Sequence, residues 1–230
     1  MARQKVRIRF RKGGDLRLLS HHDLMRCFER MLRRAALPFH STQGYNPKPR
    51  LVFALSLALG VVGCQEVVEL ELNEEVSEAE LERRLAEQAP AGLQILSVRQ
   101  IDPKAAAQVC RVSYRALLPA AARPVDLGQR IDSLLAADSL MVERTRPERR
   151  VLDIKPFVRG VRLESEAIEI DMAVTPRGGA RPEEVLGLLG LAGILEKGAV
   201  LERTLLELRD EAAGPELRDP GPVATAAIES

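Results

Sequence analysis

Patterns typical of strands and helices follow one another in the same order twice along this chain. Lys5 to Lys12 alternates charged and apolar side chains, which is the period-two pattern of a half-buried strand. Ser20 and Asp23 then stand at the spacing of a helix start, and apolar residues recur at helical spacing until a helix end before Pro38. The repeated order predicts two units of mixed helix and strand.

The first unit is expected to contain a strand, a helix, two strands, a helix and a closing strand. After the first strand and helix, the expected bounds are 51–59, 65–72, 77–86 and 93–101, with Gly60 and Gly63 at a bend or bulge. This is the order of the ferredoxin-like βαββαβ unit, in which two helices cover one face of an antiparallel sheet. The opposite face is expected to stay open for binding.

The second unit repeats the order less clearly. Its strands are expected at 109–118, 140–145, near 151–157 and 167–174, and at 200–208, with helices at 125–137 and 182–189. The predicted fold class is therefore α+β, with two tandem ferredoxin-like halves and antiparallel sheets. We place an N-terminal domain with a basic face at 1–102, a C-terminal domain at 109–209, and a disordered tail rich in Ala, Pro, Gly and Glu at 210–230.

Positive charge is concentrated at the start of the chain. The first 50 residues carry 13 Lys or Arg against 3 Asp or Glu, whereas the other 180 carry 21 basic and 30 acidic residues. Binding of a polyanion depends on the local patch rather than on the net charge of +1, so this segment is a candidate nucleic-acid surface. A solvated helix face beside an edge strand is the alternative explanation of the same charges.

Three parts of this basic segment supply the candidate RNA-binding residues: the strand, the exposed face of the first helix, and the polar loop before the second strand. Prolines fix the backbone of that loop, while its polar side chains offer donors, as a recognition loop needs. The candidates are Arg7, Arg9, Arg11, Lys12, Arg26, Arg30, Arg33, Arg34, Gln43, Tyr45, Asn46, Lys48 and Arg50.

Catalytic and metal chemistry find little support. His21, His40 and Tyr45 are candidate acid–base residues for RNA chemistry, although a histidine in the first turn of a helix more often caps or packs. His21 and His22 are adjacent, so their rings do not share one helix face, and no ligand cluster surrounds them. We expect no metal and no cofactor, and more readily a binding protein than an enzyme, because nucleophile and phosphate-loop motifs are missing.

Composition indicates a cytoplasmic protein. Its three cysteines are far apart and odd in number, which fits a reducing compartment rather than a disulfide framework. We expect no signal peptide and no membrane span, because the apolar run from Leu51 to Cys64 is too short to cross a bilayer as a helix. Aromatic residues make up 3% of the chain, so contacts to RNA are expected to reach phosphates more than bases.

Several spaced motifs resemble one family. These are Leu-Leu-Ser-His-His-Asp-Leu-Met-Arg at 18–26, Gln-Gly-Tyr-Asn-Pro-Lys-Pro-Arg at 43–50, Asp-Ile-Lys-Pro-Phe at 153–157 and Arg-Pro-Glu-Glu-Val-Leu at 181–186. Together they are similar to the radical-SAM-linked protein family over nearly the whole chain. Members of that family occur alone or fused after a cobalamin-binding-type radical SAM enzyme, with genes often near those of an RNase G type ribonuclease and of ribosomal proteins.

The resemblance implies a radical SAM enzyme as a partner. The chain has no C-x-x-x-C-x-x-C motif, so it resembles the linked module and is not expected to cleave S-adenosylmethionine itself. His22 stands where the family usually has an apolar residue, and Lys48 stands where the family commonly has His. These departures make a shared histidine catalyst at either position a poor expectation.

Three hypotheses follow from the sequence. The first is an accessory RNA-binding module that presents structured RNA, either tRNA or rRNA, to a radical SAM enzyme. The second is a protein-interaction module that docks on that enzyme without nucleic acid, with its basic residues facing an acidic surface. The third is an RNA-processing or RNA-modifying enzyme that uses His21.

Overall fold

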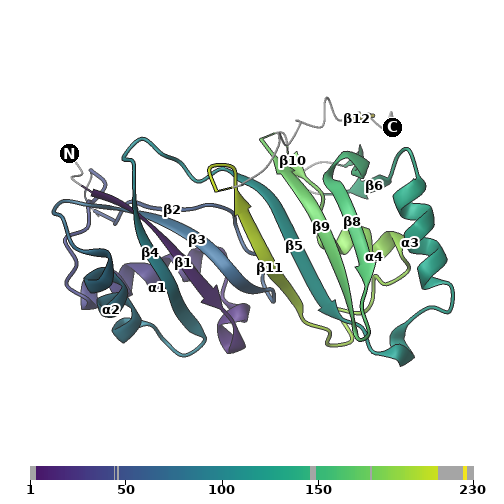
Figure 1. Cartoon of the computed structure of the whole chain (residues 1–230), viewed down its shortest axis with the longest axis horizontal. Helices are drawn as coiled ribbons and strands as arrows, with labels where there is room; N and C mark the ends of the chain where they lie inside the picture. Colours follow the sequence, from purple (N-terminus) through teal and green to yellow (C-terminus); the bar gives the residue numbers. More distant parts are fainter. Residues whose placement is uncertain are drawn as a thin grey trace. The chain divides into compact units, whose positions relative to one another are not determined.

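The computed structural model describes residues 4–43, 45, 47–145, 149–176 and 178–211, with the backbone of 225–226. These residues form a mixed α/β structure with mostly antiparallel strands, and the described part of the chain contains four α-helices (Figure 1). The chain divides into two compact units. Unit 1 comprises Met1–Gln108 and Glu202–Asp210, and unit 2 comprises Val109–Leu201 and Glu211–Ser230.

Unit 1 contains two helices and an antiparallel sheet that a final parallel strand joins. Its elements are β1 (Gln4–Lys12), α1 (His21–Arg34), β2 (Leu51–Phe53), β3 (Val62–Leu72), α2 (Glu78–Gln88), β4 (Leu93–Ile101) and β11 (Leu201–Leu208). The strands lie in the order β4-β1-β3, with β2 antiparallel to the later part of β3. β11 runs parallel to the start of β3, where Glu202 is opposite Val62.

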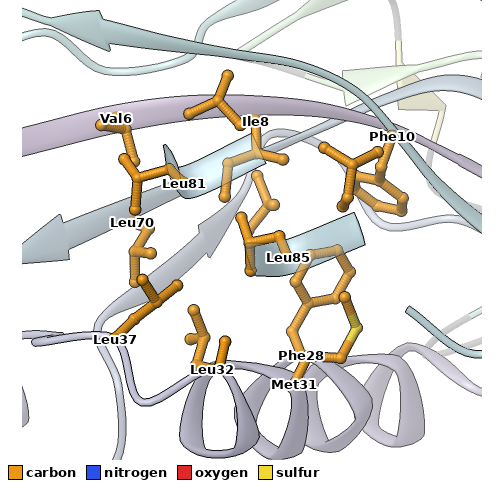
Figure 2. Packing of buried hydrophobic residues seen from close by; sticks show 14 of the residues in the cluster. Val6, Ile8, Phe10, Phe28, Met31, Leu32, Leu37, Leu70, Leu81 and Leu85 are labelled. Atoms are coloured by element: carbon orange, nitrogen blue, oxygen red, sulfur yellow. The ribbon is translucent and has the colours of Figure 1, made fainter. Parts of the chain in front are cut away.

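The core of unit 1 lies between one face of this sheet and both helices (Figure 2). Val6, Ile8 and Phe10 alternate along β1 and point toward α1, where Phe28 and Met31 are fully buried. Each helix begins as the sequence predicts: the Ser20 and Ser77 side chains accept bonds from the backbone N–H three residues later. The arginines at odd positions of β1 consequently lie on the other face of the sheet.

Unit 2 is built around one central strand that pairs with three others. Its elements are β5 (Val109–Leu117), α3 (Leu127–Ala136), β6 (Met141–Arg144), β7 (Arg150–Asp153), β8 (Val158–Leu163), β9 (Ala167–Thr175), β10 (Gly178–Gly179) and α4 (Pro182–Leu188). β9 pairs antiparallel with β5, β8 and β10. β6 and β7 form a hairpin in a separate small sheet with β12 (Thr225–Ala226). Short 3₁₀ turns at Gly14–Leu18, Ala120–Ala122 and Lys155–Phe157 complete the two units.

Two strand predictions differ from the structure. The strand expected at 51–59 ends at Phe53. Beyond it the Ser56 carbonyl accepts from Arg203, whose Nη1 lies 3.2 Å away, and so is not used in a strand ladder. The strand expected near 151–157 stops at Asp153 and a 3₁₀ turn follows, since Pro156 has no N–H to extend the ladder. β8 then starts at Val158, and the sequence analysis did not predict it.

The end of the chain also departs from the predicted bounds. The sequence placed residues 202–209 in the C-terminal half and Asp210 in the tail, but all of them belong to unit 1, where β11 pairs with β3. The side chain of Arg9 donates to the Leu206 carbonyl at 3.2 Å and adds a further contact to this strand. Of the predicted disordered tail, residues 212–224 and 227–230 lie outside the described part.

Candidate nucleic-acid interface

The exposed face of α1 carries four arginines. Arg30 lies four residues after Arg26, and Arg33 and Arg34 lie three and four residues after Arg30, so the four arginines share one side of the helix. All four are exposed, while the opposite side of α1 fills the core. Arg26 lies 3.7 Å from the Asp23 carboxylate, but Arg30 has no ion-pair partner among the described residues. Arg33 and Arg34 each donate to a backbone carbonyl, so Arg30 is the arginine of this helix for which the described residues show neither an ion pair nor a hydrogen bond.

The loop between α1 and β2 is closed at its base by backbone contacts. Ser41 and Pro49 form an antiparallel bridge, and the Thr42 N–H donates to the Lys48 carbonyl at 2.8 Å. The Lys48 N–H returns a bond to the Thr42 hydroxyl at 3.1 Å. Gln43, Tyr45 and Lys48 are exposed on this loop, and Asn46 lies outside the described residues. The described polar side chains are thus presented on a tied loop.

Arg33 joins the helix to the loop. Its Nη2 donates to the Pro47 carbonyl at 3.3 Å, and its guanidinium lies over the Phe39 ring at 5.4 Å. A planar guanidinium suits both contacts at once. We call the combined surface the helix–loop surface. It consists of Arg26, Arg30, Arg33, Arg34, Gln43, Tyr45, Lys48 and Arg50.

Arg50 lies at the end of this surface, where the loop enters β2. Its Nη1 is 3.4 Å from a carboxylate oxygen of Glu71 on β3, and its backbone N–H donates to the His40 carbonyl at 2.9 Å. About half of its side chain remains exposed. An exposed pair of this kind is weak, because solvent and salt screen it, so Arg50 can exchange Glu71 for an external anion.

The strand arginines are placed differently. Arg7 is only 5% exposed and its guanidinium contacts the carboxylates of Glu69, at 3.0 Å, and Asp210, at 2.9 Å. Arg9 donates to backbone carbonyls on β3 and β11. The sheet face that we expected to be open therefore has its cations engaged within unit 1. Arg11, at the end of β1, stays exposed, and no described contact joins it to the helix–loop surface.

Lys12 is fully buried. Its ammonium donates to the Leu19 carbonyl at 2.9 Å. Burial lowers the pKa of Lys12, the nearby carboxylate of Glu66 acts in the opposite direction, and the charge of Arg203 lowers it further. Arg7 and Lys12 therefore serve the interior of unit 1 and do not face a ligand in this structure.

The acidic partners on β3 are the residues that sequence reasoning missed. Glu69 and Glu71 alternate with apolar residues, so they share one face of a strand. That period, with β3 placed beside β1, would have indicated cross-strand pairs to the arginines of β1, and the structure places Arg7 directly opposite Glu69. No comparable signal marks Arg203, which is 137 residues from its partner Glu66.

The candidate catalytic residues are dispersed. The His21 ring packs edge-on against Phe53, with centroids 5.2 Å apart. The Asn73 amide donates to the Phe39 carbonyl, which turns its Oδ1 toward His40, so that His40 Nδ1 donates to it at 2.8 Å. No described contact joins His21, His40 and Tyr45. The described contacts therefore do not bring these three residues together as an acid–base centre.

Two of the three cysteines, Cys27 and Cys64, also lack the features of a nucleophile. Burial raises the pKa of the Cys27 thiol, against the opposing effect of Arg30 and Arg34. Burial likewise raises the pKa of Cys64, and Glu202 adds to that effect. Both thiols are thus disfavoured as thiolates at neutral pH, whereas an active-site cysteine needs the reverse.

The described residues contain no cluster of three or more His, Cys, Asp or Glu side chains arranged to hold a metal ion, and no helix among them is long and apolar enough to cross a membrane.

Unit 2 contains a hollow of about 260 Å³ beside β8 and β9. At its wall Asp171 accepts from Arg111 at 2.8 Å and 2.9 Å, and Glu169 lies 3.3 Å from Arg162. Arg159 lines the hollow as well, so cationic and anionic side chains stand together at its wall.

Fold and surface together define a mixed α/β protein that exposes a cationic helix beside a tied polar loop. The chain belongs to the family described as "Uncharacterized protein conserved in bacteria (DUF2344)", whose model matches residues 5–182. No curated protein matches it. A crystal structure titled as that of an unknown protein from Galdieria sulphuraria is similar with 14% identity and a TM-score of 0.28, over 89% of this chain and 98% of that one.

Proposed function

We propose that this chain binds structured RNA, either tRNA or rRNA, through the helix–loop surface, and that it acts as an accessory module rather than as an enzyme. The observation that carries the proposal is the Arg33 contact to the Pro47 carbonyl, which holds the loop beside the exposed arginines of α1. Arg26 and Arg30 are exposed on the same helix as Arg33, and Lys48 is exposed next to Pro47 in the loop. Spaced cations on a fixed frame suit the phosphates of a folded RNA.

The resemblance to the radical-SAM-linked family supports a more specific role. In that role, unit 1 holds the RNA while a radical SAM enzyme acts on it. A ferredoxin-like topology for unit 1 belongs to the same proposal, supported by the strand order β4-β1-β3-β2 with both helices on one face. For unit 2 the order β8-β9-β5 supports a related half into which the β6–β7 hairpin is inserted.

RNA binding is tested by filter binding of the whole chain to tRNA and rRNA fragments between 50 and 200 mM salt. Wild-type affinity is expected to fall steeply with salt, because each phosphate contact releases counterions. The variant Arg26→Ala/Arg30→Ala/Lys48→Ala is expected to bind at least tenfold more weakly at low salt, with a shallower salt slope. Arg99→Ala is the matched control, since Arg99 is exposed on the edge strand β4.

Two results would contradict the proposal: an affinity that does not change with salt, or a triple variant that binds like wild type. If Arg99→Ala weakened binding as much as the triple variant, the RNA would be held by general charge and not by the helix–loop surface. Each result is read against the circular dichroism spectrum of the same variant, which should match wild type because all four side chains are exposed.

A protein-docking module is the second candidate, and two exposed leucines on unit 1 favour it. Leu18 and Leu59 are 58% and 66% exposed. Their segments are joined by a bond from the Gly60 N–H to the Arg17 carbonyl at 2.9 Å. Two exposed leucines on segments that a hydrogen bond joins suit a protein partner better than RNA. Co-purification with a radical SAM enzyme after nuclease treatment, lost in Leu18→Ser/Leu59→Ser and kept in the triple arginine–lysine variant, would favour this candidate.

A further inference from the structure

We infer that Tyr45 is a stacking platform for an unpaired base, so that the RNA held by this chain carries a single-stranded loop, bulge or end beside its duplex. This inference rests on the proposed function. It adds a recognition element to a surface that otherwise contacts phosphates.

The exposure of Tyr45 sets it apart from the other aromatic residues. The chain has two tyrosines, five phenylalanines and no tryptophan. Tyr45 is completely exposed, whereas Tyr114 is 8% exposed and all five phenylalanines are buried or half-buried. Burial of an aromatic ring is a large favourable term, and six of these seven rings obtain it within the fold. The seventh ring, that of Tyr45, is left in contact with water and is open to a ligand.

The loop that carries Tyr45 is closed at its base. Thr42 and Lys48 are joined by two hydrogen bonds, and the Ser41–Pro49 bridge lies directly behind them. Proline restricts the backbone at Pro47 and Pro49. The two ends of the loop are therefore held together before any ligand arrives, which lowers the entropy cost of binding.

Cations lie within reach of the same ring. Tyr45 is two residues from Pro47, whose carbonyl accepts the hydrogen bond from Arg33. By chain length alone, the Tyr45 Cα lies within about 7 Å of the Pro47 Cα. Lys48 is exposed three residues further on. An aromatic face beside positive charge is the pairing that single-stranded nucleic acid requires, since one group stacks on a base while the other meets its phosphate.

The chemistry selects unpaired RNA over a plain duplex. Within a duplex, base faces are covered by their neighbours, and proteins read such RNA through its shape and phosphates. Unpaired bases can leave the stack and lie on an aromatic side chain, and every base offers a face for this contact. Tyr45 therefore gives preference for RNA structure, with little preference for sequence.

The experiment compares two RNAs of equal length and charge, a hairpin with an unpaired loop and a blunt duplex, by fluorescence anisotropy with the whole chain. Wild type is expected to bind the hairpin about 5- to 150-fold more tightly, the range that corresponds to 1–3 kcal/mol for one stacked base. Tyr45→Ala should reduce hairpin binding to the level of the duplex. Tyr45→Phe should retain the preference, because stacking needs the ring and not the hydroxyl.

Leu96→Ala serves as a matched control, since Leu96 is an exposed apolar residue on the edge strand β4. Equal binding of both RNAs by wild type, or an unchanged preference in Tyr45→Ala, would overturn the inference. In either case the proposed function stands if Arg30→Ala still weakens binding of both RNAs. If wild type bound neither RNA, the proposed function itself would fail.

Discussion

Arg203 on β11 and Glu66 on β3 form an ion pair that is buried inside unit 1. The Arg203 Nε lies 2.9 Å from the Glu66 Oε1, a second guanidinium nitrogen contacts the other carboxylate oxygen, and the two side chains are 1% and 3% exposed. Gly63 makes room for it, because a Cβ at that position would collide with the Glu66 side chain. Residues distant in sequence are thus held together at the start of β3.

Breaking this pair should destabilise unit 1 strongly. Arg203→Met leaves the Glu66 carboxylate buried without its main partner, and the expected loss is about 3–5 kcal/mol of unfolding free energy. The double variant Arg203→Met/Glu66→Leu removes both charges and should recover much of that loss. Chemical denaturation followed by circular dichroism measures both values.

The exposed ion pair of Arg83 and Glu87 on α2 supplies the comparison for the buried one. Arg83→Ala should cost much less unfolding free energy than Arg203→Met, because solvent screens a surface pair. A loss in Arg203→Met no larger than that in Arg83→Ala, or a double variant less stable than Arg203→Met, would contradict the role given to the buried pair.

Local patterns predicted much of unit 1. Alternation in 5–12 and 93–101 and the serine caps of both helices depend on neighbouring residues, and the structure has β1, β4, α1 and α2 within a few residues of the predicted bounds. The early end of β2 was not predictable, because the Ser56 carbonyl beyond it accepts a hydrogen bond from Arg203, which is distant in the sequence. Contacts between residues far apart in the sequence leave no local pattern.

The same distinction applies to the candidate site. The arginines of α1 follow from helical spacing, and the structure confirms that they are exposed on one side. The strand arginines share a face as predicted, but the pairing of Arg7 with Glu69 and Asp210 depends on which strands and segments become neighbours. Charge counted along the sequence therefore indicated the basic segment without showing which of its cations are neutralised.

Replacement of Gly92 should show how closely two turns of unit 1 approach. Gly92 has a φ of +88°, its carbonyl accepts from the Gly13 N–H at 2.7 Å, and a Cβ would lie 2.5 Å from the Gly13 carbonyl oxygen. Gly92→Ala should therefore cost backbone strain of about 1–3 kcal/mol plus the cost of this collision. Gly60→Ala is the control, because its φ is +83° but the space around it is open. Equal losses of unfolding free energy in both variants would show that the approach of Gly13 is unimportant.

Lys12 should make the stability of unit 1 increase with pH in the alkaline range. Burial lowers its pKa in the folded state, whereas an unfolded lysine keeps its proton up to about pH 10.4. Just below that pH the unfolded state therefore binds more protons than the folded state. The contribution of Lys12 to the free energy of unfolding consequently increases as pH rises. Lys12→Met should remove this gain, so that the stability of wild type improves relative to that of the variant as pH rises towards about 10.4.

Denaturation series at several pH values measure the effect of Lys12 as a difference between two slopes. Other groups titrate in the same range, but they are common to both proteins and cancel in the comparison. Lys104→Met, at an exposed position in the segment after β4, should keep the slope of wild type. A slope in Lys12→Met equal to that of wild type would show that Lys12 does not carry the effect.

Loss of the Arg33 tether should release the loop without unfolding α1. Arg33 contributes one bond to the Pro47 carbonyl and one contact to the Phe39 ring, each worth about 0.5–1 kcal/mol, so Arg33→Ala should raise the opening equilibrium of the loop about fivefold or more. Faster hydrogen exchange is expected at the Thr42 and Lys48 amides, whose bonds close the loop, and unchanged exchange in the α1 backbone. Arg30→Ala removes an equally exposed guanidinium without a bond to the loop, and exchange at both amides should then stay as in wild type. If both variants bind RNA more weakly and only Arg33→Ala shows faster exchange, Arg33 acts by holding the loop and Arg30 acts by meeting phosphate. If neither variant shows faster exchange, the loop is closed by its own backbone and does not need Arg33.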